Sequence, residues 1–223
     1  RMAEEAIEAY EARHNTVVAL VANWAGPGPS EELAEALRKI RDIAVFVLPE
    51  DPLLEAPSVG QFFDAAHATL WRGRQESLSR ESLGVIVAGM PLPNLLPRLQ
   101  REATVIVPAD RMDLLPPLIM AHRSAAYGPL ASLLMTGGFE VPESVATLLS
   151  DSEVDLPIGI TDNDAFTTAN LLSDVRGVAT GSARKVEVAR ALFDRHVDDS
   201  KLMAAIDLPR SQIRTPSMFE HQL

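Results

Sequence analysis

Cysteine is absent from the 223 residues, and aromatic side chains make up only 5% of them. The missing cysteine excludes disulfide bonds, thiolate zinc sites and cysteine nucleophiles, and it fits a reducing cytoplasm. No apolar run approaches the ~20 residues that a membrane-spanning helix needs, and no signal peptide opens the chain. Lys and Arg are outnumbered by Asp and Glu, 20 to 31, which gives a net charge of −11. We therefore expect a soluble, cytoplasmic protein that binds neither membranes nor nucleic acid.

Several signatures of enzymes are missing as well. A phosphate-binding P-loop needs Lys after its last glycine, but Gly181 is followed by Ser182. Prolines interleave with Gly26 and Gly28 and remove the N–H donors that a dinucleotide would need. The five histidines show no metal-ligand spacing, and no GxSxG nucleophile elbow occurs. We therefore expect no metal site, no cofactor and no catalytic residue.

Apolar runs that alternate with amphipathic segments are the main positive signal. This alternation predicts an α/β fold with parallel strands, since each helical crossover returns the chain to the same edge of the sheet. The predicted strands are 16–22, 43–48, 84–88, 104–107, 130–135 and 157–161. The predicted helices lie near 2–13, 30–41, 60–71, 91–100, 112–126, 142–150, 164–172 and 183–197.

A polar stretch over 72–82 predicts a domain boundary. The predicted organisation is a first domain over 1–75, a linker over 76–82, a second domain over 83–206 and a connector over 207–223. Two strands cannot hide both faces and both edges of a sheet, so the first part needs the second domain or a segment outside the chain. Because the chain begins inside a predicted helix, we expect a fragment of a longer protein.

Polar and glycine residues follow the ends of the predicted strands in the second domain. They are Asp110, Arg111, Thr136, Gly137, Gly138 and Asp162. Parallel strands end at one edge of a sheet, where helix N-termini offer free N–H groups, so this rim is the predicted site for a ligand or partner. The alternative is structural: the aspartates cap helices, the glycines permit a tight turn, and the arginine pairs with a nearby carboxylate.

At these positions the sequence resembles the DRTGG domain, whose signature is Asp-Arg after one strand and Thr-Gly-Gly after the next. The segments 104–111, 130–140 and 156–169 resemble the middle of long-form bacterial phosphate acetyltransferases. In that family a dethiobiotin-synthetase-like domain comes first, the DRTGG domain second and the catalytic domain last. Residues 18–24 and 44–51 are similar to the last strands of the first domain, and 215–223 to the segment entering the catalytic domain.

The resemblance implies two parallel-sheet units: a partial P-loop-type, dethiobiotin-synthetase-like piece and a complete small DRTGG domain. It implies a non-catalytic regulatory or assembly region of the enzyme that interconverts acetyl-CoA plus phosphate with acetyl phosphate plus CoA in acetate metabolism. The implied partners are the catalytic domain of the same chain, a second copy in a homo-oligomer and a small anionic metabolite. Asn23 matches a position near the nucleotide base of dethiobiotin-synthetase-like proteins, although an Asn after a strand is also a common turn former.

Two alternatives from other classes stay open. One is a free-standing DRTGG module that senses a small anionic ligand with no enzyme attached. The other is a remnant of a nucleotide-dependent ligase related to dethiobiotin synthetase. A P-loop upstream of residue 1 would favour the ligase, and a downstream acetyltransferase domain would favour the phosphate acetyltransferase.

Overall fold

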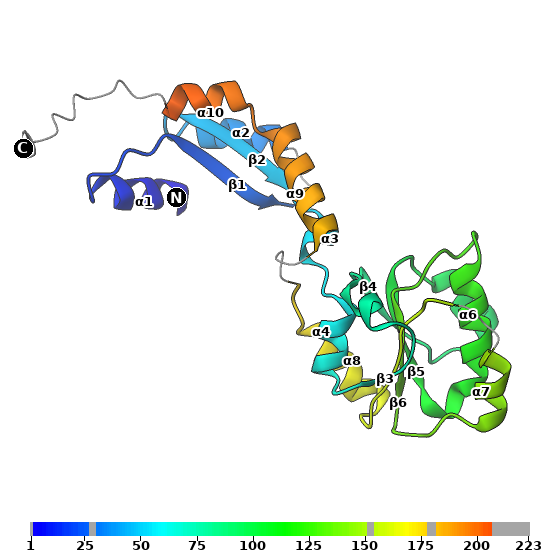
Figure 1. The fold of residues 1–223 in the computed structure, drawn as a ribbon. Coiled ribbons are helices and arrows are strands. Elements are labelled where there is room, and N and C mark those ends of the chain that lie inside the picture. Colours follow the sequence, from blue (N-terminus) through cyan, green and yellow to red (C-terminus); the bar gives the residue numbers. More distant parts are fainter. Residues whose placement is uncertain (1, 27–29, 151–153, 178–181, 207–223) are drawn as a thin grey trace, which may run out of the picture. The chain divides into compact units, whose positions relative to one another are not determined.

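A computed structural model of the chain describes residues 2–26, 30–150, 154–177 and 182–206 (Figure 1). The chain divides into two compact units. The larger unit runs from Pro52 to Val186, and the smaller contains the residues before and after it. Residue 1 and the predicted connector over 207–223 lie outside the described residues.

The smaller unit is built on two parallel strands, β1 (Ala19–Ala25) and β2 (Ala44–Pro49). The helix between them, α2 (Ser30–Arg38), places Ala34 against Val45 and Val47. Also in this unit are α1 (Met2–Glu11), α10 (Asp199–Ile206), which contacts β2, and most of α9 (Ala183–His196). The parallel pair confirms the predicted α/β character of this part.

The larger unit is built on a five-stranded sheet in the order β3-β7-β6-β5-β4. Four neighbouring strands are parallel: β4 (Gly84–Val87), β5 (Ala103–Pro108), β6 (Ser132–Thr136) and β7 (Ile158–Ile160). These four strands were predicted from their apolar runs, and their pairing confirms the α/β fold. The fifth, β3 (Thr69–Arg72), was not predicted and pairs antiparallel with β7.

The crossover helices pack against one face of this sheet. Strands β4 to β7 lie side by side in chain order, so right-handed crossovers all return on the same side. The crossovers contain α5 (Leu92–Leu95) with a 3₁₀ turn (Leu96–Arg98), a second 3₁₀ segment (Ala109–Leu114) with α6 (Leu115–Arg123), and α7 (Glu143–Ser150). Their buried Leu95, Leu118 and Leu149 form one core with Val105 and Leu133 of the sheet.

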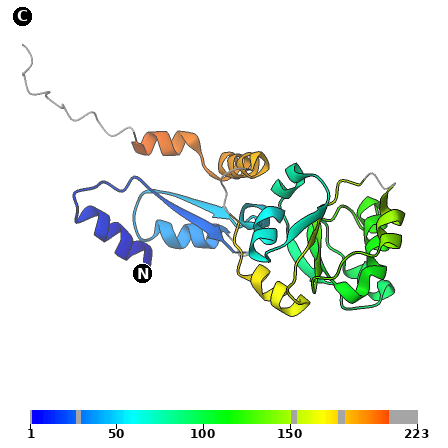
Figure 2. The same ribbon diagram turned by 60° about the horizontal axis from the view of Figure 1, so that its bottom comes forward.

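The opposite face is covered by two helices from outside the crossovers, α4 (Val59–Ala65) and α8 (Ala165–Ser173) (Figures 1 and 2). Phe62 and Phe63 of α4 and Leu172 of α8 pack with Ile106 and Leu134 of the sheet. The contact is close at Gly159 of β7, where a Cβ would lie 2.7 Å from the Phe63 ring. A glycine in this strand therefore sets how near α4 can approach.

The segment predicted as one helix over 60–71 is a helix followed by a strand. Ser58 and Gln61 form a capping box that starts α4. The helical segment ends before His67, which adopts a left-handed conformation with φ 52°. In β3, Leu70 packs toward the α4 face of the sheet and Trp71 toward the crossover face, which is the alternation of a strand. The helical spacing of the preceding apolar residues had included both in the predicted helix.

The division of the chain also differs from the predicted boundary. The predicted linker over 76–82 overlaps a 3₁₀ helix (Gln75–Ser79) and includes the buried Glu81 and Ser82. The Ser82 hydroxyl lies 2.9 Å from that of Thr104, which lies 2.9 Å from that of Ser132, so this segment is bonded to the start of the sheet.

Both ends of the larger unit are held together by a buried lysine. The Nζ atom of Lys185, in the first turn of α9, donates to the carbonyl of Ala56 at 2.6 Å and to that of Leu54 at 3.2 Å. These carbonyls lie at the end of α3 (Pro52–Glu55), where helical carbonyls lack internal partners. Burial lowers the pKa of Lys185. Residues 187–206, predicted within the second domain, belong to the smaller unit.

We predict that residues 52–186 fold cooperatively when expressed alone and that residues 84–186 do not. The shorter piece lacks β3 and the buried Val59, Phe62 and Phe63 of α4. Each such side chain contributes about 1.5–3 kcal/mol, and domains are stable by only about 5–15 kcal/mol. Circular dichroism recorded during a urea titration measures whether each piece unfolds in one cooperative transition. A sigmoidal transition for 84–186 with the slope of the longer piece would contradict it.

Candidate functional site

The rim predicted from the sequence lies at the carboxyl ends of β5, β6 and β7. Pro108 pairs with Thr136 at the ends of β5 and β6, and Met135 pairs with Ile160 at the ends of β6 and β7. The residues that follow these strands therefore leave the sheet at the same edge. Thr136 itself is buried, and Asp110 and Asp162 are exposed.

The two glycines of the rim form a tight backbone contact with the loop after β7. Both have positive φ, 90° at Gly137 and 67° at Gly138. Their N–H groups donate to the carbonyls of Asn163 at 2.7 Å and Thr161 at 3.0 Å. A Cβ on Gly138 would lie 2.6 Å from an Asp162 carboxylate oxygen. The amides of both glycines are therefore already bonded within the chain.

The arginine of the rim pairs with an aspartate two residues further along the chain. Arg111 donates through Nε to Asp113 at 3.0 Å and through Nη2 at 3.1 Å, which raises the pKa of Arg111 and lowers that of Asp113. The aspartate that caps α8 is Asp164, which accepts from the N–H of Thr167 at 2.7 Å. The ion-pair role weighed for Arg111 is thus observed, whereas the capping role falls two residues after Asp162.

The loop after β7 is tied to the end of α4. The hydroxyl of Thr161 donates to the carbonyl of Ala66 at 2.6 Å, and the side-chain amide of Asn163 donates to the same carbonyl at 2.9 Å. Both hydrogen bonds lie near the contact of Gly137 and Gly138 with this loop, so the loops of the rim are hydrogen-bonded to the end of α4. The helix that covers the sheet therefore also positions the rim.

Two aromatic side chains at this edge were missed by the sequence reasoning. Phe139 follows the glycine pair and is 60% exposed, and Phe166 lies in the first turn of α8 and is 77% exposed. Exposed aromatic side chains are typical of protein interfaces. The sequence signal was their position in the segments that follow β6 and β7, and composition does not reveal that a side chain is exposed to solvent.

Asn23 makes a local contact in the smaller unit. It lies where the pairing register of β1 and β2 shifts between Ala22 and Ala25. Its Oδ1 accepts from the N–H of Trp24 at 3.0 Å, and Trp24 has φ 61°. This geometry accounts for Asn23 as a turn former, the alternative weighed for it, and does not test a role at a nucleotide base.

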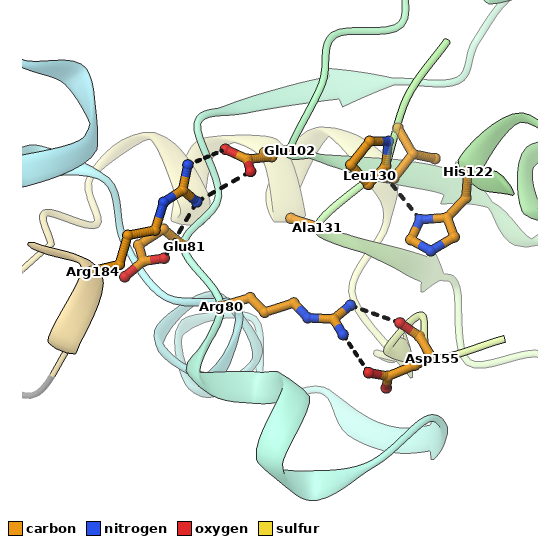
Figure 3. A pocket seen from close by; sticks show the side chains of 9 residues that line it. Arg80, Glu81, Glu102, His122, Leu130, Ala131, Asp155 and Arg184 are labelled. Atoms are coloured by element: carbon orange, nitrogen blue, oxygen red, sulfur yellow. Dashed lines mark hydrogen bonds and ion pairs between the residues drawn. The ribbon is translucent and has the colours of Figure 1, made fainter. Parts of the chain in front are cut away.

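A pocket of about 400 Å³ lies at the other edge of the larger unit's sheet, where β5 and β6 begin (Figure 3). Its polar lining comes from separate parts of the chain: Arg80, Glu81, Glu102, His122, Asp155 and Arg184. Glu102 directly precedes β5, and Leu130 and Ala131 precede β6. Sequence reasoning gave no sign of this pocket, because no motif joins these positions.

An aspartate with three side-chain partners forms one wall of the pocket. Asp155 accepts from the Ser77 hydroxyl at 2.5 Å, from Arg74 at 2.7 Å and from Arg80, whose Nη1 also donates to the Asp155 carbonyl at 2.6 Å. Hydrogen bonds from Arg74 and Ser77 hold the pKa of Asp155 far below its usual range. These hydrogen bonds therefore favour the ionised form of the Asp155 carboxylate.

A half-buried histidine lies beside this wall. Nδ1 of His122 accepts the N–H of Leu130 at 3.0 Å, so in the neutral ring the proton is on Nε2. Burial lowers the pKa of His122, and the nearby Arg80 cation lowers it further, against a weaker opposing effect of Asp155. His122 is therefore a neutral donor at pH 7.

Within the described residues, no group of three or more His, Asp or Glu side chains could hold a metal ion. None of the helices in this part of the chain is both long and apolar enough to cross a membrane.

We predict that the free energy of unfolding falls as the pH drops below about 6.5, more steeply in the unmodified protein than in His122→Asn. The folded pKa is depressed, so the unfolded state binds the proton first and protonation favours unfolding. Asn can still accept from the Leu130 N–H but does not titrate. Urea titrations of both proteins at pH 7.5 and 5.5 measure the difference, since the other histidines are common to both. Equal losses would contradict the assignment.

Three bacterial proteins, each named phosphate acetyltransferase, are similar to this chain. The protein of Nitratidesulfovibrio vulgaris is 31% identical over 185 residues, 81% of this chain and 26% of its own length. Those of Synechocystis sp. and Pseudomonas putida are 23% and 26% identical over 98% and 79% of this chain. The chain spans about a quarter to a third of the length of these relatives. They confirm the resemblance predicted from the sequence.

Comparison of structures gives a match to the CBS and DRTGG domains of the regulatory region of Clostridium perfringens pyrophosphatase, a structure complexed with the activator diadenosine tetraphosphate. The TM-score is 0.45 at 15% identity, over 79% of this chain and 88% of the other. The DRTGG domain family matches residues 62–175, just over half of the chain, from within α4 to the end of α8. By this match, the chain belongs to the DRTGG domain family.

Proposed function

We propose that this chain is the non-catalytic, regulatory and assembly region of a phosphate acetyltransferase that acts in cytoplasmic acetate metabolism. The observation that carries the proposal is the alignment of three phosphate acetyltransferases with 79–98% of the chain, across both units. A free-standing sensing module would not explain why the similarity to phosphate acetyltransferases extends beyond residues 62–175, the part that matches the DRTGG domain. The acetyl transfer between acetyl-CoA and phosphate would belong to the remaining two thirds or more of such an enzyme.

In this proposal the smaller unit is the last part of a dethiobiotin-synthetase-like domain. Its two parallel strands and single crossover are the minimal repeat of a parallel sheet, which normally has helices on both faces and further strands beside it. Val21 and Trp24 of β1 are exposed, as expected of a strand that lacks such a neighbour. In this proposal Asn23 lies beside a nucleotide base, which requires that the rest of the dethiobiotin-synthetase-like domain supplies the phosphate site.

The rim is the proposed docking site for the catalytic domain or for an anionic group. Arg111 is its cation, and its pairing with the exposed Asp113 can be exchanged for a partner carboxylate at little cost. The glycine amides are bonded internally, so a small free anion would find few donors here. The exposed Phe139 and Phe166 add apolar area, which favours a protein partner over a metabolite.

We predict that the purified chain catalyses no phosphate-dependent release of CoA from acetyl-CoA, because the proposal assigns this reaction to a separate domain. Thiol detection of CoA, compared with a buffer blank and with a mock preparation from the same host, measures it. Turnover that co-purifies with the chain through two chromatographic steps and exceeds the mock preparation would refute the non-catalytic assignment.

We also predict that Arg111→Ala and Phe139→Ala each weaken binding to a separately expressed catalytic domain by at least about fivefold, as expected for interface anchors. Arg123→Ala is the matched control, since Arg123 is an exposed arginine at the end of α6, away from the rim. Calorimetric titration measures the affinity, and melting curves check that the folds are equal. Unchanged affinity in both rim variants would remove the rim from the interface.

A further inference from the structure

The pocket at the amino ends of β5 and β6 has unused hydrogen-bonding capacity of both kinds. Figure 3 shows Arg184, Glu81 and Glu102 together at one side of the pocket and His122 and Asp155 at the other, with Arg80 extending toward Asp155. The site is independent of the rim, which lies at the carboxyl ends of the same strands. Its ligand class can therefore be argued from its own residues, without reference to the proposed function.

The donor side consists of His122 and Arg80. Nδ1 of His122 is occupied by the Leu130 N–H, which leaves its Nε2–H directed toward the side where Arg80 and Asp155 lie (Figure 3). Arg80 can turn toward a ligand without leaving Asp155 unpaired, because Asp155 keeps its bonds from Ser77 and Arg74. A ligand carboxylate could thus accept from both groups at low cost.

The acceptor side consists of Glu81, whose side chain is only 7% exposed. One of its oxygens accepts from the Ser182 hydroxyl. The other lies 3.8 Å from Arg184, which is beyond hydrogen-bond distance, while Arg184 is held by Glu102 in two bonds of 3.1 Å. A ligand ammonium could therefore donate to Glu81 while Arg184 and Glu102 stay paired.

The charge of the lining disfavours a simple anion. Three carboxylates and two arginines line the pocket, and His122 is neutral, so the sum is one negative charge. A phosphate bound by Arg80 and His122 would add negative charge to a lining that is already net negative, and it would leave the acceptor oxygen of Glu81 without a donor. A ligand that carries both signs avoids this penalty, because each of its ends meets a group with spare capacity.

We propose that this pocket binds a small zwitterion of the α-amino acid class. Its carboxylate would accept from His122 Nε2 and Arg80, and its ammonium group would donate to Glu81. The volume of about 400 Å³ is within the range of small-molecule sites and leaves room for a side chain. Glu81 accepts a hydrogen bond from Ser182, and Lys185, three residues later, donates to the carbonyls of Leu54 and Ala56. Binding of a ligand at Glu81 would therefore affect the hydrogen bonds at the two ends of the larger unit.

The test is a titration of the whole ¹⁵N-labelled chain, followed by the imidazole nitrogen signals of His122, which are assigned by their loss in His122→Asn. The probes are L-alanine and L-glutamine, with acetate, methylammonium and inorganic phosphate as partial ligands. We expect a saturable shift of Nε2 with a Kd of about 1 mM or tighter for at least one amino acid. Acetate and methylammonium should bind at least about tenfold more weakly, because each satisfies one side only.

Glu81→Gln should weaken amino-acid binding at least about tenfold, while Glu143→Gln, an exposed glutamate of α7, should leave it unchanged. Arg111→Ala should also leave it unchanged, which separates this site from the rim. The glutamine oxygen can still accept from Ser182, so we expect the Glu81 variant to fold. If the Glu81→Gln variant shows no melting transition, the proposal is tested instead by comparing the binding of amino acids and of acetate to the unmodified chain. No saturable shift with either amino acid, or equal binding of acetate or phosphate, would overturn the proposal.

Discussion

The order of the four parallel strands is the constraint on which the rest of the larger unit depends. Because β4 to β7 lie side by side in chain order, every crossover helix falls on the same face. The other face must then be covered by segments that come before the first strand and after the last one. Those segments are α4 and α8, and they supply Phe62, Phe63 and Leu172 to the second core.

This constraint also positions both candidate sites. Helix α4 meets the sheet over Gly159, and its last turn accepts the hydrogen bonds of Thr161 and Asn163 that hold the loop beside the glycine pair of the rim. The segment after β3 passes along the amino ends of the strands, where Arg80 and Glu81 enter the pocket. The predicted second domain began at residue 83 and so excluded α4, β3 and the segment with Arg80 and Glu81. In the structure these segments belong to the core of the larger unit and to its two candidate sites.

The two edges of the sheet differ in chemistry. At the carboxyl edge the glycine amides are bonded within the chain, the arginine is partly buried, and the exposed groups are carboxylates and aromatic rings. At the amino edge, paired arginines and carboxylates enclose a pocket with a neutral histidine. In this domain the signature glycines thus form a structural turn, and the pocket proposed to bind an amino acid consists of residues that the signature does not include.

The sequence by itself determined the four parallel strands of the larger unit, because runs such as 104–107 and 130–135 are apolar on both faces. It also determined the family, through Asp110-Arg111 and Thr136-Gly137-Gly138 after those strands. Only the tertiary structure decided that Leu70 and Trp71 lie on an antiparallel strand, because a four-residue strand next to a helix has too few positions to show its own period. It alone decided the pairing of Arg111 with Asp113 and the joining of Arg80, His122, Asp155 and Arg184 in one pocket, since these contacts depend on side-chain geometry and on distances between segments that no local pattern encodes.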